Sequence, residues 1–167
     1  MISKKAVVEK SDEREKGLGK KNMDEVNQRG KFRPEIIVLY CEKCLAAGEA
    51  LPRGERASSD FKVRFEVLPC SSKVQTPDLM KILEQGADGI EVVGCLDENC
   101  RSLVGSARTE KRIAFLRSLL AEVSVGEERL GIKLGNGLAA SELVALAESR
   151  ARAVQGLGVN PLKGERP

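Results

Sequence analysis

The chain has 167 residues, of which 41% are hydrophobic and 32% charged, with five cysteines and no histidine. This length is enough for one domain with a hydrophobic core, so cysteine cross-links are not needed to stabilise an undersized fold. The absence of histidine excludes Ser-His-Asp and Cys-His nucleophile arrangements, Rieske centres and zinc sites with imidazole ligands. A transition metal in this protein would be held mainly by thiolates.

The positive charge is concentrated at the amino terminus. The net charge is +3, but residues 1–34 contain 10 Lys/Arg and 6 Asp/Glu, whereas residues 35–167 contain 18 and 19. The first segment is polar and has no sustained hydrophobic period, which predicts an extension that is disordered or ordered only by a partner. The second segment lacks a basic patch with interleaved aromatic residues, so nucleic-acid binding is not expected.

The distribution of apolar residues along the sequence predicts a cytoplasmic protein. No stretch is long enough to span a membrane, and the first thirty residues lack the apolar run of a secretory signal. An odd number of cysteines in a reducing compartment argues against a disulfide framework and favours metal binding or redox chemistry.

The first folded elements are expected to be two strands. Residues 35–40 (EIIVLY) form a short apolar run that suits a strand buried on both faces. Residues 42–51 are compatible with a brief helix, and residues 53–60 are expected to form a polar loop. Residues 61–68 alternate apolar and polar side chains, which predicts the second strand.

The middle of the chain predicts two helices around a third strand. Thr76-Pro77-Asp78 combines a hydroxyl, a proline and an acid in the order typical of a helix start, and the helix is expected to stop at Gly86. Residues 90–93 predict a short strand. Residues 106–123 predict a long amphipathic helix.

A fourth strand is predicted at residues 130–134 and a last helix at residues 141–155. We therefore expect a domain over residues 35–157, followed by a flexible tail over residues 158–167. Strands alternating with helices imply a small three-layer α/β domain, flavodoxin-like or Rossmann-like, with about four parallel strands. The expected spatial order of these strands is 2-1-3-4.

The five cysteines are expected at one edge of this sheet. Cys41, Cys70 and Cys95 each follow a predicted strand, and the carboxyl ends of parallel strands meet at the same edge. Cys44 lies three residues after Cys41, and Cys100 lies five residues after Cys95. Unrelated structural cysteines would more often lie inside strands and helices.

A set of thiolates suits either a structural zinc ion or an iron–sulfur cluster. A structural zinc usually stabilises a small domain that cannot fold alone, and five cysteines exceed the four of a closed zinc site. The residues therefore favour an iron–sulfur cluster over a zinc-stabilised interaction module with four cysteine ligands. A third interpretation is a thiol–disulfide oxidoreductase that uses Cys41 and Cys44, but it leaves three cysteines unexplained.

Several motifs together resemble the iron–sulfur (delta) subunit family of methyl-viologen-reducing hydrogenase. The resemblance covers about residues 35–157 and rests on the five-cysteine spacing and on Gly86-Ala-Asp-Gly89 leading into Val92-Val-Gly-Cys95. Pro69-Cys70, Gly105 with Glu110-Lys-Arg112, and Ala140-Ser141-Glu142 also match. The chain departs from the family pattern at Arg101-Ser102, where His-Tyr is usual, and at Ser106, where Asn is common.

The resemblance implies a non-catalytic electron carrier with a [2Fe–2S] cluster. Such a subunit passes electrons from a hydrogenase, or another oxidoreductase module, to heterodisulfide-reductase-type flavin and iron–sulfur subunits. Four of the five cysteines would ligate the cluster, and we expect these to be Cys41, Cys70, Cys95 and Cys100, with Cys44 as the spare.

Basic residues follow the last cysteine. Arg101, Arg108, Lys111 and Arg112 are expected near the cluster loop. They form either a solvated helix face or a surface that docks an acidic partner and orients the cluster for electron transfer.

Overall fold

The computed structural model describes residues 32–49, 54–96, 100 and 102–164. The predicted extension, residues 1–34, therefore lies almost entirely outside the described residues. The described strands are β1 (Glu35–Cys41), β2 (Gly54–Ala57), β3 (Lys62–Leu68), β4 (Gly89–Gly94) and β5 (Leu130–Leu134). The α-helices are α2 (Thr76–Glu84), α3 (Gly105–Glu122) and α4 (Ala140–Gln155). Short 3₁₀ turns lie at Glu42–Cys44, Ser71–Lys73 and Glu127–Arg129.

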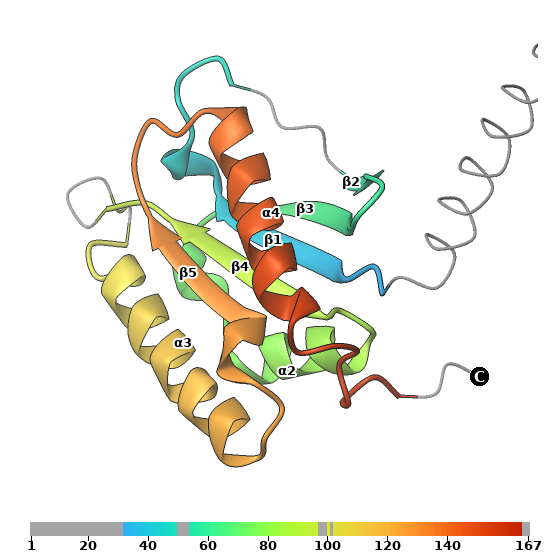
Figure 1. The fold of residues 1–167 in the computed structure, drawn as a ribbon. Helices are drawn as coiled ribbons and strands as arrows, with labels where there is room; N and C mark the ends of the chain where they lie inside the picture. Colours follow the sequence, from blue (N-terminus) through green and yellow to red (C-terminus); the bar gives the residue numbers. More distant parts are fainter. Residues whose placement is uncertain (1–31, 50–53, 97–99, 101, 165–167) are drawn as a thin grey trace, which may run out of the picture. The chain divides into compact units, whose positions relative to one another are not determined.

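The strands form one mixed sheet in the order β2-β3-β1-β4-β5 (Figure 1). Four of them are parallel: β1 pairs with β3 on one side and β4 on the other, and β5 pairs with β4. Their order, β3-β1-β4-β5, confirms the predicted order 2-1-3-4. The carboxyl ends of β1, β3 and β4 consequently lie at the same edge of the sheet.

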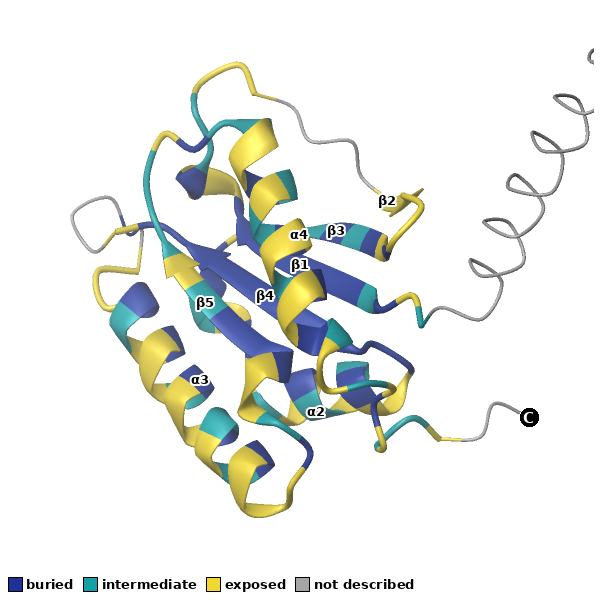
Figure 2. Cartoon of the chain, viewed as in Figure 1, coloured by how far each residue is buried: buried dark blue, intermediate teal, exposed yellow. Residues whose placement is uncertain are grey.

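Helices cover both faces of the sheet. The core beneath α2 and α3 is built from side chains that are at most 4% exposed: Ile37, Leu39, Leu79, Leu83, Ile90, Val92, Ile113, Leu116 and Leu120. On the other face, α4 contacts β1 and β4 and buries Leu143, Ala147, Ala151 and Val154. Figure 2 shows the buried strands between the exposed outer faces of the helices. The predicted three-layer α/β architecture is confirmed.

Two local predictions were wrong. The expected loop at residues 53–60 contains β2, an exposed edge strand that pairs antiparallel with β3. Its residues have no hydrophobic pattern, because edge pairing through the backbone does not require one. The expected helix at residues 42–51 is reduced to the 3₁₀ turn Glu42–Cys44. Beyond it, the backbone at residues 44–46 bonds to Leu138, which replaces helical hydrogen bonds.

Buried Asp88 ties the C-terminal segment to the amino edge of the sheet. One carboxylate oxygen accepts hydrogen bonds from the Glu35 N–H at 2.9 Å and from Lys163 Nζ at 2.7 Å, and the other accepts from the Asn160 N–H at 3.0 Å. The Asn160 amide nitrogen donates to the carbonyls of Leu83 at 3.0 Å and Ala87 at 2.7 Å. Residues 158–164, which were expected in a flexible tail, are therefore bound to the domain through polar side chains. Residues 165–167 lie outside the described part.

We expect Asn160→Ala to lower the free energy of unfolding by about 1–3 kcal/mol, because it removes the two buried hydrogen bonds that the Asn160 amide nitrogen donates to the carbonyls of Leu83 and Ala87. Urea unfolding followed by circular dichroism measures this change. The neighbouring Val159→Ala, at a side chain that is 61% exposed, is the matched control and should change it by less than about 0.5 kcal/mol. Equal stability of the two variants would contradict the role assigned to Asn160.

Candidate metal centre

All five cysteines lie at the carboxyl edge of the sheet, as the sequence predicts. Cys41 ends β1, Cys44 closes the following 3₁₀ turn, Cys70 comes two residues after β3, and Cys95 directly follows β4. Cys100 lies in the loop that leads into α3. Every one of these thiols is free and at most 7% exposed. This edge of the sheet thus holds five buried thiols, none of which is in a disulfide.

Cys41, Cys44 and Cys95 form one group. Burial, with added repulsion from Cys41 and Cys95, raises the pKa of the Cys44 thiol to about 12. Burial and the proximity of Cys41 likewise raise the pKa of Cys95 to about 11. Thiols in such surroundings resist ionisation unless a cation binds to them. Cys44 and Cys95 therefore stay protonated until a metal binds, and all three thiols are protected from solvent.

Cys70 and Cys100 lie together beside Gly105, the first residue of α3. A side chain at Gly105 would place its Cβ 2.9 Å from Cys100 Sγ and 3.1 Å from Cys70 Sγ. These distances are too short for carbon and sulfur that are not bonded to each other. Glycine at this position therefore allows both sulfurs to lie close to the first residue of α3.

The beginning of α3 stabilises the thiolate of Cys100. Burial opposes ionisation, but hydrogen bonds from the backbone N–H groups of Ser102, Ser106 and Gly105 lower the pKa of Cys100 to about 7. The N–H groups of a first helical turn have no partner within the helix, so they are available to an anion. Cys100 is therefore prepared to act as an anionic ligand.

Hydroxyl groups of Ser72, Ser102 and Ser106 surround the sulfurs, although the sequence pattern indicates no contact between these serines and the cysteines. Ser72 Oγ donates to Cys70 Sγ at 3.2 Å, and Ser102 Oγ lies 3.3 Å from the same sulfur. Ser106 Oγ donates to the carbonyl of Cys95 and lies 3.9 Å from Cys95 Sγ. Serine is too common in loops for its position alone to have signalled these contacts.

The donor set fits an iron–sulfur cluster in its chemistry, since it consists of free, buried thiols gathered at one edge of the sheet. Within the described part of the chain, no three Cys, Asp, Glu or His side chains converge as ligands of one metal ion. An iron–sulfur cluster distributes its thiolate ligands over several iron atoms, so they need not surround a single point.

The basic residues predicted near this edge have different surroundings. Arg108 and Lys111 are exposed on α3, whereas Arg101 lies outside the described residues. Arg112 is half-buried, and its Nη1 donates to the carbonyls of Ser72 at 2.8 Å and Val74 at 3.1 Å. Arg112 therefore holds the turn that carries Cys70 and Ser72.

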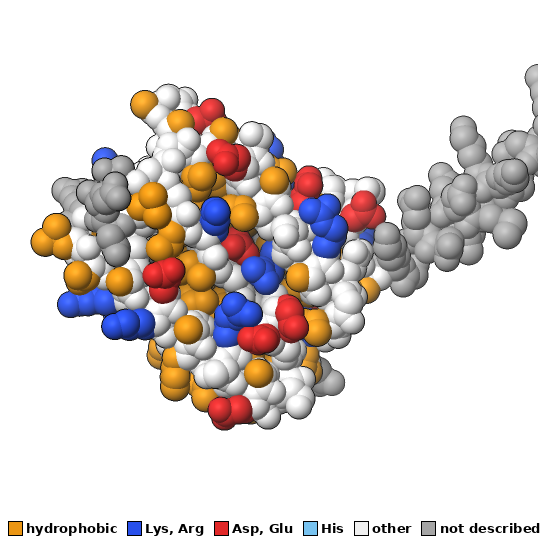
Figure 3. Space-filling view, turned by 60° about the vertical axis from the view of Figure 1, so that its left-hand side comes forward, with side chains coloured by type: hydrophobic (Ala, Val, Ile, Leu, Met, Phe, Trp, Pro, Cys, Tyr) orange, Lys and Arg blue, Asp and Glu red, His pale blue; other side chains and the backbone are white. Residues whose placement is uncertain are grey.

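Exposed hydrophobic side chains flank the cysteine loop. Leu96, Leu103 and Val104 are 42%, 80% and 48% exposed, and Leu103 has a positive φ of 56°. On the left of Figure 3, hydrophobic side chains and Lys or Arg side chains lie next to one another. An apolar patch bordered by positive charge thus lies next to the buried thiols.

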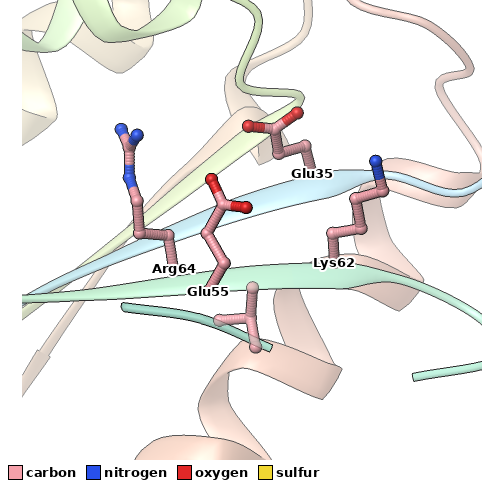
Figure 4. Close-up of a pocket in the computed structure, with 5 residues that line it drawn as sticks. Glu35, Glu55, Lys62 and Arg64 are labelled. Atoms are coloured by element: carbon pink, nitrogen blue, oxygen red, sulfur yellow. The ribbon is translucent and has the colours of Figure 1, made fainter. Parts of the chain in front are cut away.

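A separate polar pocket lies near the amino end of β1 and β3 (Figure 4). It is lined by Glu35, Glu55, Lys62, Val63 and Arg64 and contains no cysteine. Its acidic and basic side chains balance one another in charge.

Among the described residues, no helix is long and apolar enough to cross a membrane.

Comparison with known proteins connects this fold and cysteine edge to one family. Residues 36–158 match the family model of the methyl-viologen-reducing hydrogenase delta subunit. The vhu iron-sulfur subunit of the F420-non-reducing hydrogenase of Methanocaldococcus jannaschii is 28% identical over 79% of this chain and 98% of its own length. The iron-sulfur subunit of the F420-non-reducing hydrogenase of Archaeoglobus profundus is 26% identical over 81% and 97%.

A further match is to part of a larger protein. It is one subunit of the ferredoxin/F420H2-dependent CoB-CoM heterodisulfide reductase of Methanosarcina acetivorans, which is 28% identical over 97 residues, or 58% of this chain and 12% of that protein. The family model covers well over half of the chain. The chain therefore belongs to the methyl-viologen-reducing hydrogenase delta subunit family.

Proposed function

We propose that this protein is an electron-transfer subunit that carries a [2Fe–2S] cluster. It relays electrons between a hydrogenase, or another oxidoreductase module, and heterodisulfide-reductase-type flavin and iron–sulfur subunits. The observation that carries the proposal is the set of five free, buried thiols at one sheet edge in a chain without histidine. Family membership supports the iron–sulfur chemistry, since relatives are named iron-sulfur subunits.

Four cysteines would hold the cluster: Cys41, Cys70, Cys95 and Cys100. The first three end or follow parallel strands, and Cys100 lies across Gly105 from Cys70. The cluster would supply reversible one-electron reduction. The protein's own groups fix the thiolates, exclude water and neutralise the added charge. Cys44 is the spare thiol in this scheme.

The redox partners are other subunits of a multi-subunit complex. The same domain occurs as a separate hydrogenase subunit in some relatives and as a segment of a larger heterodisulfide reductase subunit in others. A domain joined covalently to a reductase subunit in one protein is expected to dock against such a subunit when it is a separate chain. The free state of all five cysteines supports a cytoplasmic location.

The alternatives have less support. A thiol–disulfide oxidoreductase requires an accessible thiol of low pKa, but Cys41 and Cys44 are 1% and 0% exposed, and the pKa of Cys44 is raised. A structural zinc requires four ligands around one ion. The described residues provide no group of even three.

The docking surface that we propose consists of Leu96, Leu103, Val104, Arg108 and Lys111. The three apolar side chains lie beside the cysteine loop, where a partner's redox centre must approach. The two exposed basic side chains on α3 would steer an acidic partner surface. Arg112 is left out because it bonds to Ser72 and Val74.

Anaerobically purified full-length protein is expected to be brown, with visible charge-transfer bands and about two irons per chain. Serine substitution of Cys41, Cys70, Cys95 or Cys100 should each lower the iron content sharply, whereas Cys44→Ser should retain it. Colourless protein that contains zinc would support the zinc module. Metal-free protein that reduces disulfides would support the oxidoreductase.

Gly105→Ala should leave the fold intact but reduce the bound iron to less than half, because its Cβ would displace the sulfurs of Cys70 and Cys100 from their positions. Iron analysis and far-UV circular dichroism measure the two effects. Gly156→Ala is the matched control, since a Cβ there meets only one backbone oxygen at 3.8 Å. Full iron content in Gly105→Ala would place the cluster elsewhere.

The double charge reversal Arg108→Glu/Lys111→Glu is expected to weaken binding to co-purifying redox subunits by on the order of tenfold at low salt, with a smaller effect at high salt. Surface plasmon resonance at two ionic strengths provides the measurement. Arg152→Glu, on the exposed side of α4, is the control. Unchanged affinity in the double variant would remove this face from the interface.

A further inference from the structure

Two serines contact the sulfur of Cys70 from different segments. Ser72 belongs to the 3₁₀ turn after Cys70, and Ser102 belongs to the loop before α3. Their hydroxyl oxygens lie 3.2 and 3.3 Å from Cys70 Sγ, within hydrogen-bonding distance of a sulfur acceptor. Neither hydroxyl has another protein partner in the described part of the chain that would compete for its proton.

These contacts are held in place by the surrounding structure. Arg112 donates to the carbonyls of Ser72 and Val74 and thereby fixes the turn that carries Ser72. The loop at Ser102 is closed by a hydrogen bond of 2.9 Å from the Leu103 N–H to the Cys100 carbonyl. The two hydroxyls are therefore positioned before any cluster binds.

Hydrogen bonds to a ligand sulfur favour the more reduced state of an iron–sulfur cluster. Reduction adds negative charge, part of which resides on the thiolate sulfurs, and a donated proton stabilises that charge. A cluster with more donors at its sulfurs consequently has a higher reduction potential. Cys100 already accepts from backbone N–H groups, and a side-chain variant does not remove those bonds.

We propose that Ser72 and Ser102 are positioning residues that raise the reduction potential of the cluster by hydrogen bonding to Cys70 Sγ. This inference rests on the proposed function, because it requires an iron–sulfur cluster with Cys70 as a ligand. It adds a means by which this chain sets the driving force for electron transfer without changing a ligand.

The test uses full-length protein purified anaerobically, with the midpoint potential measured by reductive titration followed by visible absorbance and electron paramagnetic resonance. Ser72→Ala and Ser102→Ala should each lower the midpoint potential, and the double variant should lower it further. Ser72→Thr and Ser102→Thr retain a hydroxyl and should restore the parent value. Because Ser102 is exposed, Ser102→Ala decides the question if the double variant loses iron.

Thr109→Val is the matched control. Thr109 is buried in α3, one turn after Gly105. Its hydroxyl donates to the Gly105 carbonyl at 2.8 Å and not to a sulfur atom. This variant should keep the parent potential. Serine variants with full iron content and an unchanged potential would overturn the inference while leaving the proposed function intact. A parent protein without iron would overturn both.

Discussion

Parallel pairing of β1 with two neighbours is the constraint on which the candidate site depends. The register places Cys41 opposite Leu68 on β3, while Tyr40 lies opposite Val93 on β4. The carboxyl ends of these three strands therefore lie at one edge of the sheet. A cysteine is the last residue of β1, and another cysteine follows the last residue of β3 and of β4 within two residues. A shift in strand order would separate the thiols, so the site is a consequence of topology.

The opposite edge of the sheet provides stability instead of chemistry. Arg129 is 1% exposed, and its guanidinium donates to the carbonyls of Val125, Asp88, Gly158 and Val159. Together with Asp88 and Asn160, it joins the C-terminal segment to the amino ends of the strands. Buried polar groups are costly unless they are paired, and these groups are paired. The loops at the carboxyl edge are left to hold ligands and meet partners.

The environment of the thiols divides them by role. Burial makes Cys44 and Cys95 hard to ionise, whereas the first turn of α3 makes Cys100 easy to ionise. Ser102 and Ser106 bring hydroxyls to Cys70 and Cys95. Small polar groups thus surround the sulfurs of Cys70 and Cys95, beside an exposed apolar patch.

The sequence by itself determined the four parallel strands, their order and the edge at which Cys41, Cys70 and Cys95 meet, because hydrophobic burial leaves a local period and parallel topology follows from strand–helix alternation. Only the tertiary structure decided the contacts that depend on partners distant in the chain. The strand β2 pairs through backbone groups, Asn160 reaches carbonyls more than 70 residues away, and Ser102 meets a sulfur 32 residues away. Arg108 and Arg112 are both arginines of α3, and the sequence does not show that Arg112 contacts two backbone carbonyls. A hydrogen bond between distant residues needs only one donor close to one acceptor. It therefore produces no repeated pattern in the sequence, unlike the burial of one face of a helix or strand.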